Sequence, residues 1–265
     1  AASGRGVGDL RRIVITHGHT DHFGQAESLR QQSGAEVLAH ETERPKLAGE
    51  RWVADHLVAF FREAGMPESF FAAFSQMVNA YRIFFDPLSA FTPLADGDTL
   101  ALGDERLRVL HCPGHSQGHV CLYHDDGALI AGDLLLEEVS PNPIVEFSPD
   151  GRRQTTLPQY LHSLRRVLLL NCDLAYPGHG DPITNPSGRI RELIAHHEQR
   201  KEEIAARLDK TPKSLVDLTH DLYQGLDDLN LMLALSEVIG HLDLLAEEKR
   251  IATSRKRGVV LYRGK

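Results

Sequence analysis

The chain has 265 residues, of which 42% are hydrophobic and 25% charged, and its net charge is −8 at pH 7. This is ordinary globular composition, with enough chain to bury a sizeable core in one or two domains. No apolar run approaches the length of a membrane span and no signal pattern opens the chain, which predicts a cytoplasmic protein without a membrane partner. Three cysteines in apolar surroundings exclude a disulfide framework and predict buried, reduced thiols.

The first predicted elements are a strand, a loop and a helix. A short β-branched run at residues 11–15 predicts the strand, and it ends at once in the sequence Thr-His-Gly-His-Thr-Asp-His of residues 16–22. Helical spacing follows over residues 23–32, and Val37 and Leu38 predict another short strand. Long amphipathic stretches then predict a helical insertion at about residues 45–90.

The next predicted elements are mostly strands. Apolar residues between 99 and 110 lead into the turn Cys-Pro-Gly-His of residues 112–115. Strands are expected at 120–123 and 128–131 with Gly127 in the hairpin turn between them, and the second strand stops at Asp133. A helix at 157–170 and a strand at 174–176 come before Pro-Gly-His-Gly at 177–180. Each histidine or aspartate cluster thus follows a strand, where site residues collect.

The last quarter of the chain predicts a separate unit. A charged helix at 187–208 acts as connector, and residues 209–265 are assigned to a second domain beside a first domain of residues 1–208. Within the second domain we expect a helix from Thr211, one or two helices in 228–247, and two strands around a basic turn, which is typical of a winged helix. Its end carries seven basic residues and no acidic one: Lys249, Arg250, Arg255, Lys256, Arg257, Arg263 and Lys265.

The loop after the first strand predicts a metal site. His17, His19, Asp21 and His22 place four donors within a few residues, and Gly18 is expected to let the backbone turn sharply there. Imidazole and carboxylate donors without thiolate suit zinc best, although iron and manganese accept the same donors.

Four motifs, at residues 16–22, 113–116, 132–133 and 177–180, occur in the order of the metallo-β-lactamase superfamily, which the chain resembles. The resemblance implies an α/β fold, an αββα sandwich of two sheets between helices. It also implies two divalent metal ions, the first held by His17, His19 and His115. Asp21, His22 and His179 would hold the second, and Asp133 would bridge both.

The mechanism implied by the resemblance is hydrolysis by a metal-bridging hydroxide. Asp21 or a metal-bound water would shuttle the proton, so Asp21 and Asp133 are the catalytic candidates. No serine or cysteine nucleophile is required. His119 is interpreted as a strand residue near the site, with a functional role no better supported.

The substrate is left open between two classes. The C-terminal segment resembles the winged-helix domain of one family branch, which contains glyoxalase II-like and single-strand endoribonuclease-like relatives. In the favoured hypothesis the chain hydrolyses a small-molecule ester or thioester, in the manner of glyoxalase II or a lactonase, and the winged helix is structural or forms a homodimer. Phenylalanines of the insertion would then roof an apolar pocket: Phe60, Phe61, Phe70, Phe71 and Phe74.

In the alternative hypothesis the basic wing grips RNA and the metal site cuts a phosphodiester. The acidic net charge argues against it, since a charge run is most often a solvated face. A non-enzymatic nucleic-acid-binding module would require lost ligands, and none is lost.

The start of the chain departs from the family pattern. Several strands precede the first histidine motif in the family, whereas only sixteen residues precede His17 here. We therefore expect that N-terminal strands are missing from this sequence.

Overall fold

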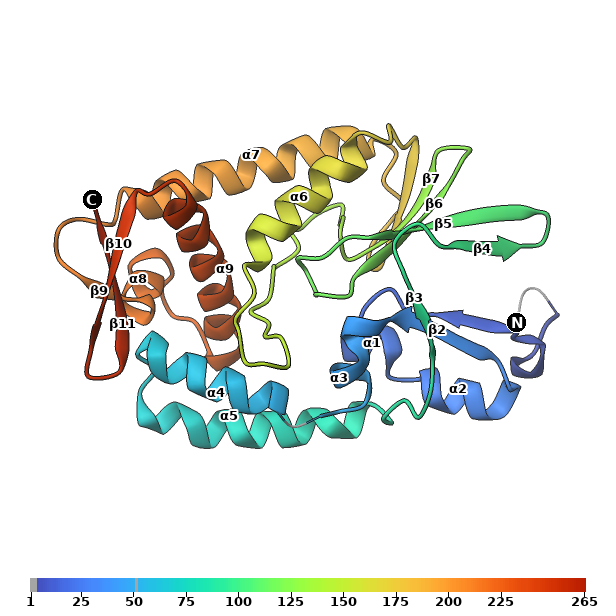
Figure 1. The fold of residues 1–265 in the computed structure, drawn as a ribbon, viewed down its shortest axis with the longest axis horizontal. Coiled ribbons are helices and arrows are strands. Elements are labelled where there is room, and N and C mark those ends of the chain that lie inside the picture. The colour runs from blue at the N-terminus through green and yellow to red at the C-terminus, as the bar shows by residue number, and fades with distance from the viewer. Residues whose placement is uncertain (1–3, 51) are drawn as a thin grey trace.

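The computed structural model describes residues 4–50 and 52–265, and two of its β-sheets lie together in the half of the molecule that holds the N-terminus (Figure 1). The first sheet is parallel, with the order β1 (Arg12–Val14), β2 (Glu36–His40), β3 (Thr92–Leu94). The second has five strands in chain order: β4 (Thr99–Leu102), β5 (Glu105–His111), β6 (Val120–His124), β7 (Ala128–Gly132) and β8 (Leu174–Pro177).

The two sheets pack face to face through side chains that alternate along their strands. Leu38 and Leu94 of the first sheet meet Val109 and Leu122 of the second in one apolar cluster. Leu110, the neighbour of Val109, points to the other face of β5 and packs beneath helices. This period of two buries both faces of the second sheet and places a helical layer outside it.

Helices cover the outer face of each sheet, so the expected αββα sandwich is confirmed. On the first sheet lie α1 (Thr20–Phe23), α2 (Ala26–Ser33) and α3 (Arg44–Leu47), the last preceded by the short 3-10 helix η2 (Glu41–Glu43). On the second lie α6 (Thr156–Leu168) and α7 (Pro186–Ala205). All three cysteines are free and buried in this second layer, as predicted.

The predicted insertion is helical. It contains α4 (Trp52–Ala64) and α5 (Glu68–Tyr81), followed by the 3-10 helix η3 (Arg82–Phe84). The chain then returns to the first sheet through β3, a strand that the sequence did not predict. Its three residues include Pro93, which suits only the edge of a sheet and weakens the pattern of a strand.

The C-terminal elements are β9 (Lys213–Ser214), α8 (Leu215–Leu222), α9 (Asp228–Glu247), β10 (Ile251–Lys256) and β11 (Val259–Gly264). The expected helix start at Thr211 is wrong, because Lys213 and Ser214 pair with β11. Helix α8 begins after Ser214, whose hydroxyl accepts from the Asp217 N–H while the Asp217 carboxylate accepts from the Ser214 N–H. This reciprocal cap fixes the helix start.

One apolar core joins the insertion to the C-terminal elements. Phe61 and Phe70 of the insertion pack in the same cluster as Leu218 and Leu235, and Ile204 of α7 belongs to it as well. Phe61, Phe70 and Phe74 are 3–5% exposed and belong to this core, whereas Phe60 and Phe71 are partly buried against it. A roof of these phenylalanines over a substrate pocket stays a prediction. The domain boundary at residue 208 stays a prediction, and the core crosses it.

Helix α9 contradicts the expectation that no apolar run approaches a membrane span. It has 20 residues and a mean hydropathy of 1.4 in its most apolar window, so length and composition alone would allow it to cross a bilayer. In the fold 56% of that window is buried, against α6, α7 and α8.

Strand β1 forms one edge of the first sheet. In the described parts of the chain it pairs with β2 and no strand covers its other edge. The expected N-terminal strands stay a prediction.

Two buried histidines connect α7 to α9. His241 Nδ1 donates to the Glu237 carbonyl at 2.7 Å, which leaves its Nε2 to accept from His197 Nδ1 at 3.3 Å. Ser140 then donates to His197 Nε2. Burial, followed by the nearby His241, lowers the pKa of His197 to about 3. Both rings are therefore neutral in the folded chain.

Replacement of Phe61 by alanine should lower the free energy of unfolding by about 3–5 kcal/mol, because it empties part of the shared core. Urea denaturation followed by two optical probes measures the effect, and both probes should report one transition. The matched control is Leu169→Ala at an exposed position, which should change stability by less than about 0.5 kcal/mol. Separate transitions for the two ends of the chain would contradict a shared core.

Stability should fall as the pH decreases from about 6.5 towards about 3, since the unfolded chain binds a proton at His197 that the folded chain excludes. The slope attributable to one such group is at most about 1.4 kcal/mol per pH unit. His197→Leu should reduce the slope, and His162→Leu, at an exposed position of α6, should leave it unchanged. Equal slopes in wild type and His197→Leu would refute this assignment.

Candidate metal centre

The seven predicted donors come from four segments, each of which follows a strand. His17 and His19 lie in the loop after β1, and His19 precedes α1, which carries Asp21 and His22. The other three donors lie after strands of the second sheet: His115 after β5, Asp133 after β7 and His179 after β8. These segments meet at the same end of the two packed sheets, so donors distant in sequence become neighbours.

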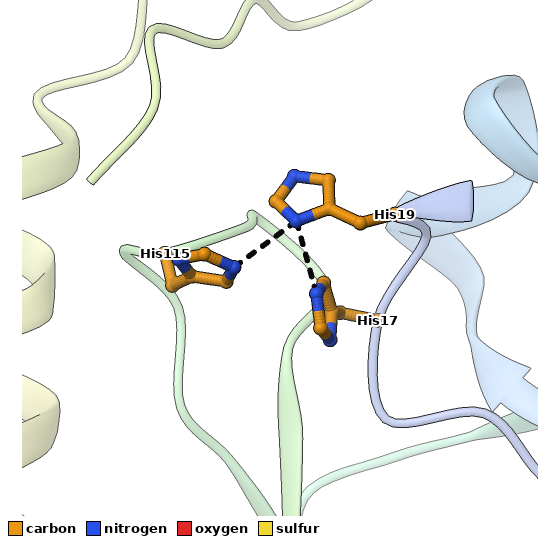
Figure 2. Close-up of side chains that lie close together, drawn as sticks. All are labelled: His17, His19 and His115. Carbon is orange, nitrogen blue, oxygen red and sulfur yellow. Dashed lines mark hydrogen bonds between the residues drawn. The ribbon is translucent and has the colours of Figure 1, made fainter. Parts of the chain in front are cut away.

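Three histidines form the first cluster (Figure 2). His19 Nδ1 lies 3.0 Å from His17 Nε2 and 3.0 Å from His115 Nε2. Burial, as the largest cause, lowers the pKa of all three rings, so they are neutral and offer lone pairs. Three imidazole nitrogens converging on one point could hold a metal ion.

Asp21, His22 and His179 form a second, more open cluster. His22 Nε2 lies 3.1 Å from His179 Nε2, and Asp21 Oδ2 lies 3.2 Å from the same His179 nitrogen. Burial lowers the pKa of His22, but the carboxylates of Asp133 and Asp21 outweigh it and the net shift is upward. The side chains of Asp21 and His179 are more than half exposed, so this cluster faces solvent.

Asp133 lies between the two clusters. Its Oδ2 is 3.4 Å from His22 Nε2, 3.6 Å from His115 Nε2 and 3.7 Å from His179 Nε2. Its Oδ1 is buried without a hydrogen-bond partner. A Cβ at Gly178 would lie 2.2 Å from that Oδ1, so only glycine fits beside it. An unpartnered carboxylate oxygen among several imidazole rings fits a metal-binding role.

Two further contacts orient these donors. His115 Nδ1 donates to the Asn142 carbonyl at 2.9 Å, which leaves Nε2 facing His19. His119, interpreted from sequence as a strand residue near the site, is fully buried, and its Nε2 accepts from the Asp133 backbone N–H at 3.0 Å. It therefore positions Asp133, and sequence spacing carried no signal of that contact.

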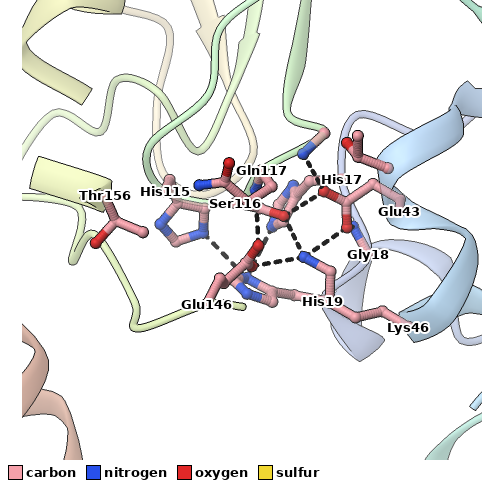
Figure 3. A network of polar contacts seen from close by, with 12 residues as sticks. His17, Gly18, His19, Glu43, Lys46, His115, Ser116, Gln117, Glu146 and Thr156 are labelled. Atoms are coloured by element: carbon pink, nitrogen blue, oxygen red, sulfur yellow. Dashed lines mark hydrogen bonds and ion pairs between the residues drawn. The ribbon is translucent and has the colours of Figure 1, made fainter. Parts of the chain in front are cut away.

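Sequence reasoning also missed a buried ionic network beside the first cluster (Figure 3). Lys46 Nζ lies 2.6 Å from both Glu43 Oε2 and Glu146 Oε1. Burial opposes ionisation of Glu43, but Lys46 and the hydrogen bonds hold its pKa below the ordinary value. Burial raises the pKa of Glu146. Neither carboxylate belongs to a histidine motif, so no local pattern identified them.

His119→Leu should lower the free energy of unfolding of the metal-free protein by about 1–3 kcal/mol, because it leaves the Asp133 N–H buried and unpaired. Chemical denaturation measures the change. His162→Leu, at an exposed position of α6, serves as the control. Wild-type stability in His119→Leu would show that this hydrogen bond does not support Asp133.

Comparison with known proteins agrees with this geometry. The family profile of the metallo-beta-lactamase superfamily matches residues 1–179. The probable metallo-hydrolase YqjP of Bacillus subtilis is 32% identical over 262 residues, covering 97% of this chain and 81% of that protein. An atrochrysone carboxyl ACP thioesterase of Emericella nidulans is 29% identical over 185 residues, 67% of this chain and 56% of that one.

Among solved structures, a metallo-beta-lactamase family protein from Thermus thermophilus superposes with a TM-score of 0.85 at 32% identity. The superposition covers 100% of this chain and 83% of that protein. The profile match, the length of the Bacillus alignment and the two donor clusters agree: the chain belongs to the metallo-beta-lactamase superfamily.

Proposed function

We propose that the chain is a two-metal hydrolase whose seven donors act as the sequence resemblance implied. His17, His19 and His115 hold one ion, and Asp21, His22 and His179 hold the other. The supporting observation is Asp133 Oδ2, which lies within 3.7 Å of a histidine nitrogen in each cluster and can bridge two ions. Zinc is the proposed metal because imidazole and carboxylate donors suit it, and iron or manganese would accept the same set.

Two ions bound in these clusters would activate a water near neutral pH and polarise the substrate carbonyl. The chain's own residues divide the remaining work. Asp133 is buried and held by His119, so it fixes the spacing between the clusters. Asp21 is exposed beside His179 and is placed to accept a proton from the attacking water and release it to solvent.

The proposed substrate is a small-molecule ester or thioester. The thioesterase name of the fungal relative supports this class, although this chain spans only 56% of that protein. We propose a cytoplasmic enzyme that acts on this substrate without RNA, and homodimer formation through the C-terminal elements stays a prediction.

The charge pattern of the basic C-terminal run, residues 249–265, weakens the endoribonuclease alternative. The expectation of seven unopposed basic residues is wrong for two of them, because Arg250 binds Glu202 and Glu248, and Arg255 binds Glu63 of α4. These partners come from distant segments and were invisible in the local run of sequence. Within the described residues the other five basic side chains form no ion pair, so RNA is retained as a substrate in the test: Lys249, Lys256, Arg257, Arg263 and Lys265.

Purified protein should contain two metal ions per chain and hydrolyse thioesters or esters while leaving single-stranded RNA intact. Elemental analysis gives the metal content, and turnover is followed with S-lactoylglutathione, acyl-coenzyme A thioesters, lactones and labelled RNA. Asp133→Asn should lose bound metal and turnover together because the bridging charge is removed. Asp181→Asn, an exposed position near His179, should retain both.

RNA cleavage that depends on Asp133 and weakens with salt would favour the endoribonuclease alternative. Wild-type protein without bound metal would refute the proposal.

A further inference from the structure

We propose that Glu43 is a positioning residue of the metal centre, a single buried carboxylate that holds the loop of His17 and His19 against the loop of His115. The inference rests on the proposed function, since it concerns the same ions. Glu43 lies in η2, outside every histidine and aspartate motif, and among the described residues no hydrogen bond or ion pair joins it to a proposed ligand side chain.

The contacts of Glu43 join two loops that are far apart in sequence (Figure 3). Its Oε2 accepts from the backbone N–H of Gly18, which lies between His17 and His19, at 2.9 Å. Its Oε1 accepts from the Gly118 N–H at 2.5 Å and from the hydroxyl of Ser116, the residue after His115. The side chain is completely buried, so water does not compete for these bonds.

The side chain of Glu43 explains why positions 18 and 118 are glycine. A Cβ at Gly18 would lie 2.5 Å from Glu43 Oε2, and one at Gly118 would lie 2.6 Å from Glu43 Cγ. Neither glycine has a positive φ, so a left-handed backbone does not require glycine at either position. Both positions are glycine because the Glu43 side chain lies against the backbone there.

The charge of Glu43 is balanced within the same network. Lys46 Nζ lies 2.6 Å from Glu43 and 2.6 Å from Glu146, whose second oxygen accepts from the Gln117 N–H at 2.9 Å. A buried carboxylate without a counter-charge would be strongly destabilising. The network therefore holds three successive residues of the His115 loop: Ser116, Gln117 and Gly118.

An ionised carboxylate only accepts hydrogen bonds, and all the groups around Glu43 are donors. An amide of the same shape would turn an N–H₂ group towards one of those donors. Glu43→Gln therefore keeps the volume of the side chain, weakens the hydrogen bonds that hold the two loops and removes the negative charge beside Lys46. Glu41→Gln is the matched control, because Glu41 lies in the same turn, is 54% exposed and pairs with Arg44.

The experiment measures zinc affinity of the metal-free full chain by competition with a chromophoric chelator, together with the visible spectrum of the cobalt(II)-substituted protein. Glu43→Gln should bind zinc about 10–100-fold more weakly than wild type and show an altered cobalt spectrum. Glu41→Gln should match wild type in both. A thermal melt of the metal-free proteins distinguishes loss of metal positioning from loss of folding.

A folded Glu43→Gln protein with wild-type zinc affinity and cobalt spectrum would overturn the inference, even if its metal-free stability fell. If Glu43→Gln fails to fold, Ser116→Ala provides the test. It removes the hydroxyl that donates to Glu43 and keeps the bonds from the Gly18 and Gly118 N–H groups. Weaker zinc binding in Ser116→Ala supports the inference and unchanged binding overturns it. Failure of the proposed function is distinct, since it would appear in wild type as absent metal or absent turnover.

Discussion

The arrangement of the molecule depends on burying a carboxylate, Asp133, between two groups of histidines. A buried carboxylate is costly unless its oxygens are satisfied, and one oxygen of Asp133 has no protein partner. The surroundings are therefore built around it: β7 delivers it, His119 accepts from its N–H, and Gly178 leaves room beside it. Two cations next to Asp133 would supply the missing interactions, which is why geometry and family membership agree.

Hydrogen bonds also extend from the first histidine cluster to helix α9, far from the donors. The carbonyl of Asn142 accepts from His115, while its side-chain amide donates to the Leu233 carbonyl in α9. Val145, three residues later, donates to Ser236 of the same helix. Helix α9 also fills the core shared with the insertion. The C-terminal elements are thus tied to the first histidine cluster by hydrogen bonds as well as by packing.

The donors were predictable because their motifs are local and dense. Four of them lie within the six residues from His17 to His22, and each motif follows a strand whose apolar pattern is clear. The sandwich and the helical insertion were predictable for a similar reason, since periods of two and 3.6 residues report burial directly. The wrong predictions concern residues whose structure or charge depends on a distant segment. Lys213 and Ser214 pair with β11 and do not start a helix, and Arg255 is neutralised by Glu63.

The sequence by itself determined which side chains can bind metal and which face of each strand or helix is apolar, because these properties belong to residue type and short-range spacing. Only the tertiary structure decided that Glu43 and His119 support the donors, that Gly18 is small because of Glu43, and that Phe61, Phe70 and Phe74 of the insertion are core. Each of these depends on a contact between residues that are not neighbours in the sequence, 14 positions apart for His119 and Asp133 and 25 for Gly18 and Glu43. Such a contact is set by how layers pack, and no local pattern in the chain records it.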